Sequence, residues 1–363
     1  MKLKRRYALS SAALAGLVGL LATGCGGGGS DAKSNEIVFG IGDPQLQIGT
    51  APYTSVLDTM GYCKKAGLSL KEQPTQGAVA SLQALLTGQV NVVNGGSSAF
   101  YQVAAKHPEV RVISLGVGNI WHTYVPDSSP ITTLKQLKGK TVGAQSLSSA
   151  SYLFGRAGMS AGGMNPDSDV KWLSVGVGAQ AANAMKKHDI DAYASYEGPS
   201  GVMQQLLGEK MRPLPSALDQ LPGTIGLATT KKFLADHRDE VVKFLKCYNQ
   251  GQLFGATNPT AALKIHWKAH PDQKPNGLSE KEAIKQSLPI VADRYKSDAR
   301  TSGGNPPGYM DTATVQRSID FFLKTGLIKQ KVSAGDVVDL SAAKDAGDYG
   351  AAAVKKQAEQ YGK

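Results

Sequence analysis

The chain has 363 residues, of which 41% are hydrophobic and 19% are charged, so its length suits two α/β domains better than one small domain. This composition excludes global disorder. The formal net charge is +11, but arginine and aromatic residues do not alternate along any stretch of the sequence, so a nucleic-acid partner is not expected. We interpret the excess of basic residues mainly as a solvated surface. The alternative is that their positive field attracts anionic solutes.

The start of the chain, residues 1–24, has the pattern of a secretory signal peptide. A basic stretch precedes an apolar run over 8–21, which is shorter than a membrane span. The sequence LATGC at 21–25 resembles a lipobox with alanine at the usual leucine position, which predicts lipidation of Cys25. Ordinary secretion is the alternative. Residues 25–33 would form a flexible tether, and loss of the four basic residues of the signal lowers the charge from +11 to +7.

Strand-like and helix-like patterns alternate through the first third of the chain. Strands are predicted at 36–40, 68–71, 90–93 and 109–115. Between them, 77–89 places apolar residues on one helical face. Such alternation indicates an α/β fold with mainly parallel sheets and helical crossovers.

The alternation restarts after residue 133. A short helix before Gly139 is followed by strands at 141–144, 170–175 and 190–194 and by helices at 146–159 and 180–187. The helix–turn–strand unit of 84–93 has an echo at 184–193, which indicates two similar lobes.

Helical patterns dominate after about residue 220, so a helical C-terminal part is expected. We therefore predict a first lobe over 34–123, a second lobe over 124–222, and a return to the first lobe over 223–363. The two remaining cysteines, Cys63 and Cys247, could form a disulfide in an oxidising compartment. Nothing in the sequence brings them together, and we favour two separate buried thiols.

Five stretches resemble, in order, segments of one protein family. They are GYCKKAGL at 61–68, LLTGQVN at 85–91, TLKQLKGKTVG at 133–143, DIDA at 189–192 and FFLKTGLI at 321–328. The family is that of the substrate-binding proteins of nitrate, sulfonate and taurine ABC importers, including the thiamine-precursor-binding branch. The resemblance covers about residues 36–330. It departs from the family at Cys63, where an aromatic residue is usual, at Asn91, where aspartate is usual, and at 187–189, where a turn glycine is usual.

This resemblance implies a two-lobe periplasmic-binding-protein type II fold that closes around a solute, without enzymatic activity or cofactor. It implies ABC permease and ATPase subunits as partners, and we expect a monomer in the periplasm or at the cell surface, which the predicted lipid at Cys25 anchors to a membrane. A solute-sensing lipoprotein is one alternative. An enzyme related to a fungal pyrimidine synthase is another, but it would require a dense cysteine cluster, and the three cysteines here are scattered.

Two loops that lead from predicted strands into predicted helices are candidate ligand contacts. Loop 94–98 contains Gly96 and Ser97, and loop 145–151 contains three serines. These serines are Ser146, Ser148 and Ser149. Helix N-termini expose free N–H groups and a positive partial charge, which suits anionic oxygens. Ordinary helix capping is the alternative.

Other candidate contacts lie near the first strand, at the expected crossing between lobes and after a second-lobe strand. They are Gln45, Gln47, Trp121, His122, Tyr124, Tyr196 and Glu197. Aromatic residues at a hinge can stack on a ligand or pack at the lobe boundary. Glu197 could pair with an amine or cap a helix.

The predicted ligand is a small organic anion such as an aliphatic or aromatic sulfonate or carboxylate, with a nitrogen heterocycle such as a thiamine precursor as the alternative. No metal is expected, because His266 and His270 share a helix face without a third ligand. GKT at 139–141 is no phosphate loop, because Leu134 stands where the first glycine is required.

Overall fold

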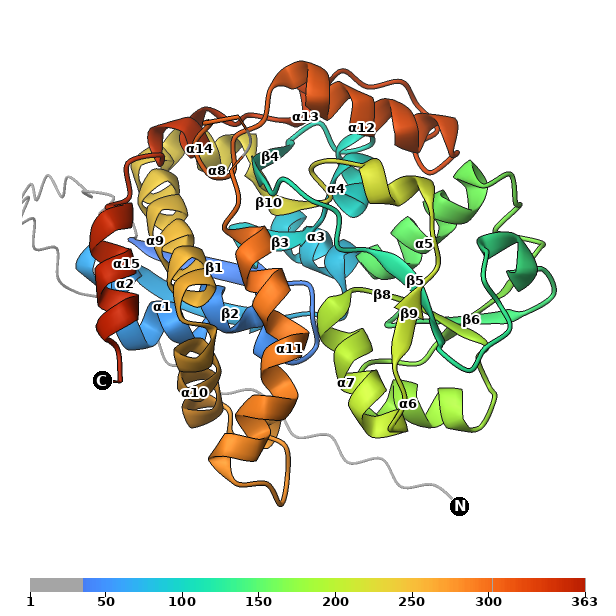
Figure 1. Cartoon of the computed structure of the whole chain (residues 1–363). Helices are drawn as coiled ribbons and strands as arrows, with labels where there is room; N and C mark the ends of the chain where they lie inside the picture. Colours follow the sequence, from blue (N-terminus) through green and yellow to red (C-terminus); the bar gives the residue numbers. More distant parts are fainter. Residues whose placement is uncertain (1–34, 302, 363) are drawn as a thin grey trace, which may run out of the picture. The chain divides into compact units, whose positions relative to one another are not determined.

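The computed structural model describes residues 35–301 and 303–362 and contains two five-stranded sheets flanked by helices (Figure 1). The predicted signal peptide, the lipidation of Cys25 and the tether lie outside the described residues. The first sheet has the order β2-β1-β3-β10-β4 and the second has the order β7-β6-β8-β5-β9. The α/β class, the two-lobe fold and the helical C-terminal part are thus confirmed.

The strands of the first sheet are β1 (Glu36–Ile41), β2 (Ser69–Pro74), β3 (Val92–Gly96), β4 (Val110–Leu115) and β10 (Ile225–Thr230). The strands of the second sheet are β5 (His122–Pro126), β6 (Thr141–Ala144), β7 (Lys171–Ser174), β8 (Ala192–Ser195) and β9 (Met211–Pro213).

The helices before β5 are η1 (Ile48–Tyr53), α1 (Ser55–Met60), α2 (Tyr62–Lys65), α3 (Ala78–Leu86) and α4 (Ser97–Ala104). Those between β5 and β10 are η2 (Leu134–Leu137), α5 (Ala150–Ala161), α6 (Ala179–Lys186), α7 (Glu197–Leu207) and η3 (Ala217–Gln220). The helices after β10 are α8 (Lys231–Asp236), α9 (Arg238–Thr257), α10 (Pro259–Ala269), η4 (Pro271–Gln273), α11 (Glu280–Asp298), α12 (Thr312–Lys324), α13 (Ala334–Val337), α14 (Ser341–Asp345) and α15 (Ala351–Gln360).

Both sheets are mixed rather than mainly parallel. In the first sheet β1 runs parallel to β2 and β3, whereas β10 runs antiparallel to β3 and β4. In the second sheet β6 runs parallel to β7 and β8, whereas β5 runs antiparallel to β8 and β9. The antiparallel strands β5 and β10 are those that the chain enters from the other sheet, so no helical crossover within a lobe fixes their direction.

The chain crosses between the sheets twice, from β4 to β5 and from β9 to β10. The two crossings are joined by hydrogen bonds. Trp121 Nε1 donates to the carbonyl of Thr224 at 3.0 Å, and Thr224 Oγ1 donates to the carbonyl of Gly118 at 2.8 Å. These bonds hold the crossings side by side, as a hinge between two lobes requires.

The two lobes repeat one local design. Asn91 Oδ1 accepts a hydrogen bond of 2.9 Å from the backbone amide of Val38 on β1. Asp191 Oδ2 accepts one of 2.9 Å from the amide of Thr141 on β6. The departure from the usual aspartate at position 91 therefore keeps the acceptor, because an amide oxygen can replace a carboxylate oxygen in this contact.

Cys63 and Cys247 form a disulfide that joins α2 to α9, so the expectation of two separate thiols was wrong. The cysteines are 184 residues apart in sequence. Both are buried in one hydrophobic cluster that α9 shares with the first sheet. Their proximity depends on this packing of distant segments, which local sequence patterns do not show.

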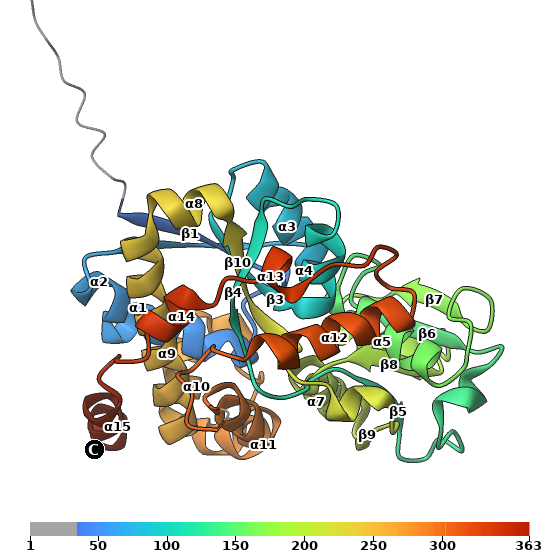
Figure 2. The same ribbon diagram turned by 90° about the horizontal axis from the view of Figure 1, so that it is seen from above.

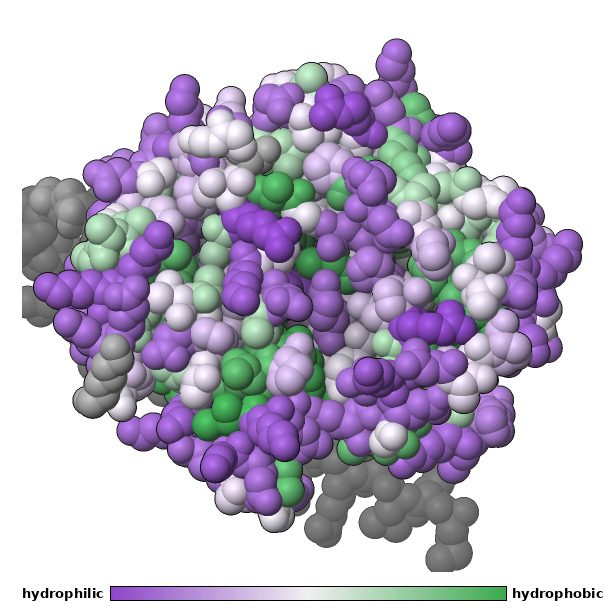
Figure 3. All heavy atoms as spheres, in the orientation of Figure 1, coloured by the Kyte–Doolittle hydropathy of each residue, from purple (hydrophilic) through white to green (hydrophobic). Residues whose placement is uncertain are grey.

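The helix α12 extends from the first lobe towards α5 of the second lobe (Figure 2). Just after α12, the carbonyl of Thr325 accepts a hydrogen bond of 2.9 Å from Ser160 Oγ on α5. Hydrophilic side chains cover much of the face in Figure 3, with smaller apolar patches between them. Within the described residues, no helix is both long enough and apolar enough to span a bilayer.

Candidate functional site: a cavity between the lobes

A small cavity lies between the two lobes. Its volume is about 30 Å³. In the first lobe its walls come from the loop after β1, from η1, the start of α3, β3, β10 and α11. The crossing before β5, the loops before α5 and α7, and the start of α5 supply the rest. Because a water molecule needs roughly 10–15 Å³ measured in this way, the cavity has room for only a few waters. A solute can enter only if the lobes or their side chains move apart.

Asp43 lies in the wall of this cavity, two residues after β1. Only 7% of Asp43 is exposed, and Oδ1 accepts a hydrogen bond of 3.1 Å from the hydroxyl of Tyr196 in the second lobe. Burial raises the pKa of Asp43 to about 6, although the Tyr196 bond and the charge of Arg294 act in the opposite direction. Asp43 therefore carries its negative charge at neutral pH, at a direct contact between the lobes.

Arg294 on α11 lines the same cavity and is only 5% exposed. Its Nε donates to Asp298 at 2.6 Å, and its Nη1 lies 3.7 Å from Oε2 of Glu197 in the second lobe. Burial alone would lower the pKa of Arg294, but the charges of Asp298 and Glu197 outweigh it and raise that pKa. Nη1 makes no hydrogen bond with any described residue, so it is a buried donor available to a ligand.

Carboxylates outnumber cations around the cavity. Asp43, Asp298 and Glu197 all interact with the single guanidinium of Arg294. Burial raises the pKa of Glu197 to about 7, and the nearby positive charge of Arg294 limits that rise. The site therefore has excess negative charge whenever these acids are ionised.

Aromatic side chains form much of the remaining wall, namely Tyr53, Trp121 and Tyr196. Trp121 stacks on Phe154 of α5 with ring centroids 5.2 Å apart, and its edge contacts Tyr196 at 5.3 Å. These rings offer flat apolar surface beside the charged groups, which suits a small organic body.

The predicted serine loop of the second lobe contacts the first lobe beside α3. Ser146 Oγ and Ser148 Oγ donate to the carbonyl of Gln76 at 3.1 and 3.0 Å. The carbonyl of Ser148 accepts a hydrogen bond of 3.2 Å from the amide of Val79. Two of the predicted serines thus join the lobes directly in this conformation.

The predicted contacts separate into distinct groups. Those that line the cavity are Gly96, Trp121 and Tyr196. Tyr124 and Glu197 line a neighbouring cavity of about 370 Å³ between α7 and α11. Ser149 accepts the amide of Tyr152 and caps α5, as the capping alternative supposed.

The remaining predicted contacts have other surroundings. Gln45 is exposed, whereas Gln47 is buried at the start of η1. Ser97 is buried at the start of α4. His122 Nδ1 lies 3.4 Å from Asp219, and burial lowers the pKa of His122 despite that neighbour. Gln47 Nε2, Ser97 Oγ and His122 Nδ1 are buried without a hydrogen-bond partner among the described residues, so a ligand contact at these positions stays a prediction.

Sequence reasoning missed Asp43, Tyr53 and Arg294. Asp43 lies two positions before Gln45 in the same loop, and the choice between them depends on which side chain is buried. Arg294 belongs to an amphipathic helix far along the chain, and no local signal identifies it.

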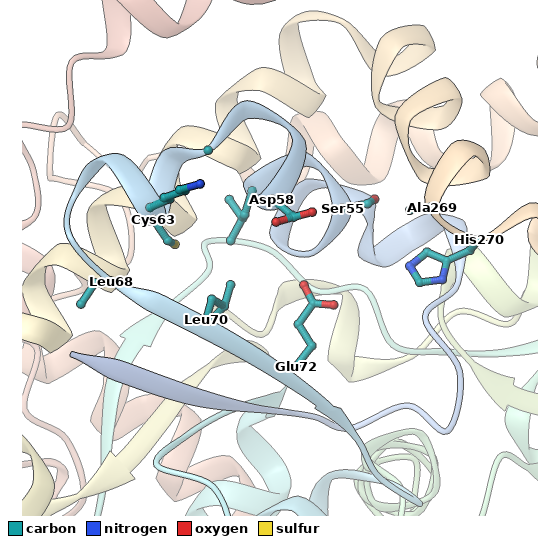
Figure 4. Close-up of a pocket in the computed structure, with 11 residues that line it drawn as sticks. Ser55, Asp58, Cys63, Leu68, Leu70, Glu72, Ala269 and His270 are labelled. Atoms are coloured by element: carbon teal, nitrogen blue, oxygen red, sulfur yellow. The ribbon is translucent and has the colours of Figure 1, made fainter. Parts of the chain in front are cut away.

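A second cavity, of about 430 Å³, lies on the first lobe between β2, α1 and the end of α10 (Figure 4). The carboxyl groups of Asp58 and Glu72 and the ring of His270 face it. Burial, and then the charge of Asp58, raises the pKa of Glu72 to about 7. Because one lobe supplies all of its walls, closure of the lobes does not enclose this cavity.

The neighbouring His266 has a structural role. Its Nδ1 lies 2.9 Å from Ser55 Oγ and its Nε2 lies 2.9 Å from the carbonyl of Leu46. Both ring nitrogens are thus occupied. Over residues 35–301 and 303–362, no group of three or more potential ligands could hold a metal ion.

The two sheets, the double crossing and the cavity between the lobes define a protein of the periplasmic-binding-protein fold. A family model described as "NMT1/THI5 like" matches residues 56–262, which is more than half of the chain. The chain belongs to the NMT1/THI5-like family. No curated protein matches the sequence.

Solved structures share this fold at low sequence identity. The alkanesulfonate-binding protein SsuA from Xanthomonas axonopodis pv. citri, bound to MOPS, is similar with a TM-score of 0.63 at 15% identity, over 84% of this chain and 98% of that one. The ligand-binding component of an ABC-type import system from Staphylococcus aureus has a TM-score of 0.60 at 15% identity, over 86% and 98%. The desulfurization enzyme DSZB also matches, with a TM-score of 0.52 at 13% identity, over 85% and 98%. The fold is therefore found in binding proteins and in an enzyme.

Proposed function

We propose that this protein is an extracytoplasmic, lipid-anchored solute-binding protein that captures a small organic anion between its lobes and delivers it to the permease of an ABC importer. The observation that carries this proposal is a cavity whose walls come from both lobes. A solute held there contacts both lobes, so its binding energy favours the closed conformation. The family and the binding-protein neighbours support the same role.

The anion class, a sulfonate or carboxylate, is supported by Arg294. A guanidinium in a buried wall whose Nη1 makes no hydrogen bond with any described residue matches the oxygen atoms of these groups. The aromatic wall formed by Tyr53, Trp121 and Tyr196 supports the alternative, a flat nitrogen heterocycle. Only the anion needs the guanidinium of Arg294 as a binding partner, so a substitution of Arg294 distinguishes the two ligand classes.

The extracytoplasmic location is supported by the disulfide between Cys63 and Cys247, because such bonds persist in oxidising compartments. Lipid anchoring depends on Cys25 and the sequence around it. Mass spectrometry of the protein from a membrane fraction tests this part, because a lipidated Cys25 would be the first residue of the mature chain.

The ligand class is tested by a thermal-shift screen of the purified protein against alkanesulfonates, arenesulfonates, carboxylates and aminopyrimidines. A ligand at 100 times its Kd stabilises the folded state by about 2.7 kcal/mol, a rise of several degrees in Tm. We expect sulfonates or carboxylates to give this rise. A response to aminopyrimidines alone would overturn the anion class.

A matched pair of variants sharpens the screen. Arg294→Lys removes the planar guanidinium from the cavity and is expected to abolish the rise with anions. Arg156→Lys is the control, because Arg156 pairs with Asp167 at 2.7 Å on the second lobe and does not line the cavity. An anion-induced rise that survives Arg294→Lys would refute the role of Arg294.

A further inference from the structure

A further cavity, of about 420 Å³, lies on the first lobe and shares no lining residue with the cavity between the lobes. Its walls come from α10, from the segment between α10 and α11, from the first residue of α11 and from the chain just after α15. Asn258 Nδ2, at the start of α10, donates to the carbonyl of Ala358 on α15 at 2.9 Å and so holds these two helices together. The volume lies in the range of roughly 300–1,000 Å³ that is usual for small-molecule sites.

Positive charge dominates this cavity, which we call the lysine cavity. Lys264, Lys268, Lys274 and Glu280 line it, so its charged lining residues have a net charge of +2. Lys264 Nζ lies 2.6 Å from Glu280 Oε1. The hydrogen bond and charge of Lys264, and then the charge of Lys274, lower the pKa of Glu280. Glu280 is therefore ionised at neutral pH, and its single charge leaves two ammonium groups uncompensated.

The spacing of the lysines on α10 adds to this excess. Lys264 and Lys268 are four residues apart on one helix and line the same cavity, and like charges at that spacing repel each other and destabilise a helix. Glu280 relieves the repulsion at Lys264 only. An anion seated between the lysines would relieve the rest.

Trp267 adds a hydrogen-bond donor to the same wall. This residue is only 6% exposed, and its Nε1 is buried without a hydrogen-bond partner among the described residues. Because a buried indole N–H usually has a partner, the oxygen of an entering ligand would supply the contact that the protein itself lacks. Tyr361, whose ring centre lies 5.6 Å from that of Phe254, provides a second aromatic residue in the wall. The lysine cavity thus combines excess positive charge with apolar ring surface.

We propose that the lysine cavity is a second ligand site, at which Lys268, Lys274 and Trp267 Nε1 bind the phosphate group of an organic phosphomonoester. Such a group has a second pKa of about 6 and a charge near −2 above that pH, which matches the two uncompensated lysines. A lysine ammonium binds phosphate as a point charge, and the aromatic wall suits the organic part of the ligand. A soluble phosphate ester and the headgroup of a phosphomonoester lipid offer the same chemistry.

The test is isothermal titration calorimetry with phenyl phosphate at pH 7.5 and low ionic strength, because salt screens partly exposed charges. The double variant Lys268→Gln/Lys274→Gln should bind phenyl phosphate at least about tenfold more weakly than the wild type, since it loses two charged partners. Lys135→Gln/Lys171→Gln is the matched control. It removes the same charge from two exposed lysines of the second lobe and should leave the affinity unchanged.

Two further comparisons define the ligand. Trp267→Phe keeps a ring but removes the N–H, and it should weaken phenyl phosphate binding about fivefold or more. Benzenesulfonate has the same ring and a single negative charge, so its affinity should depend less on Lys268 and Lys274 than that of phenyl phosphate. Dihexanoyl phosphatidic acid and glycerol-3-phosphate then separate the two sources, because tighter binding of the first identifies a lipid headgroup and tighter binding of the second a soluble ester.

Several results would overturn the second site, and none of them affects the proposed importer role. The first is that no phosphomonoester binds the folded wild-type protein. The second is that phenyl phosphate binds the lysine double variant as tightly as the wild type, or that the control pair weakens binding equally. The third is that binding is lost in Arg294→Lys but retained in the lysine double variant, which would place the phosphate between the lobes. Equal dependence of benzenesulfonate and phenyl phosphate on the two lysines would refute the choice of a dianion. Full affinity in Trp267→Phe would refute the role of its N–H.

Discussion

The hydroxyl of Tyr196, in the second lobe, donates a hydrogen bond of 3.1 Å to Oδ1 of Asp43, in the first lobe. This bond crosses the space in which a captured solute would lie, so it stabilises the closed conformation without a solute. It also means that a solute must compete with Tyr196 for Asp43. The conformation of the empty protein and its affinity for ligand are therefore coupled through one hydroxyl group.

Tyr196→Phe removes this hydroxyl while keeping the ring beside Arg294. A hydrogen bond to a charged group is worth about 1.5–3 kcal/mol, so the variant should shift the empty protein roughly tenfold or more towards the open form. Small-angle X-ray scattering should record a larger radius of gyration for the empty variant. Tyr152→Phe is the control, because the hydroxyl of Tyr152 accepts its hydrogen bond within the second lobe, from Arg156 at 3.3 Å, and makes none to the first lobe among the described residues. Identical scattering from the wild type and Tyr196→Phe would contradict this account.

The affinity for any solute that places an ammonium group beside Asp43 should depend on pH, because burial raises the pKa of Asp43 to about 6 in the empty protein. An ammonium beside Asp43 favours the ionised carboxylate and lowers that pKa, so binding near pH 6 releases a proton. The affinity should therefore rise from pH 5 to pH 7 and then level off. Calorimetry in buffers of different ionisation enthalpy measures the released proton.

Other groups near Asp43 define the control for this pH dependence. Tyr196 donates a hydrogen bond to Asp43, and Tyr53 and Tyr193 lie near enough to interact with its charge. Burial raises the pKa of each of these tyrosines above its ordinary value, so none of them titrates in this range. Glu197, with a pKa of about 7, also lies beside Arg294 and can add its own slope. The contribution of Asp43 is the slope of affinity against pH in the wild type minus the same slope in Asp43→Asn. Equal slopes in the two proteins would assign the effect to Glu197.

The disulfide between Cys63 and Cys247 should contribute strongly to stability. It closes a loop of about 184 residues and joins α2 to α9. Removal of a native disulfide typically costs about 2–5 kcal/mol, so the double variant Cys63→Ser/Cys247→Ser should have a clearly lower Tm. Dithiothreitol should lower the Tm of the wild type and leave that of the double variant unchanged. A wild-type Tm insensitive to reductant would show that the bond contributes little.

The turn after α3 and the matching turn after α6 both need a residue with a left-handed backbone, but only the first has glycine there. Gly88 has φ of 74°, and His188, which follows the corresponding helix of the second lobe, has φ of 59°. A left-handed backbone costs a residue with a side chain about 1–2 kcal/mol, partly offset by the flexibility of glycine in the unfolded chain. His188→Gly should therefore raise the free energy of unfolding by roughly 0.5–1 kcal/mol, and Gly88→Ala should lower it by about 1 kcal/mol. Urea denaturation of both variants measures these changes, and a loss of stability in His188→Gly would contradict them.

The sequence predicted those parts of the fold and site that depend on local patterns. Strand 141–144 was placed with its observed bounds because apolar residues there follow a helix ended by glycine. The loops with Gly96 and Ser148 were found because a strand leads directly into a helix, and both loops lie at the contact between the lobes. The mixed sheets were missed because strand direction after a crossing depends on the other lobe.

The charged part of the site could not be read in the same way. Arg294 is one of several polar residues on α11. Its side chain lines the cavity because of the way that helix packs against η1 and α7. Asp43 and Gln45 lie in one loop, yet Asp43 is 7% exposed and Gln45 faces solvent. Pattern and composition locate the strands, the helices and the loops between them, whereas burial decides which side chain within a loop or helix takes part in the site.

Closure of the lobes should depend on the absence of a side chain at Gly96. A Cβ atom at this position would lie 2.5 Å from Cβ of Ala150 and 2.8 Å from the ring of Phe154, both on α5 of the second lobe. Such overpacking costs about 1–3 kcal/mol, so Gly96→Ala should weaken solute binding by roughly 5- to 150-fold and enlarge the radius of gyration of the protein with solute. Gly49→Ala is the matched control, because Gly49 lines the same cavity and a Cβ there meets nothing within 4 Å. If Gly96→Ala binds and closes like the wild type, the lobes do not approach each other at this point during capture, and the cavity described here is not the place where the solute is enclosed.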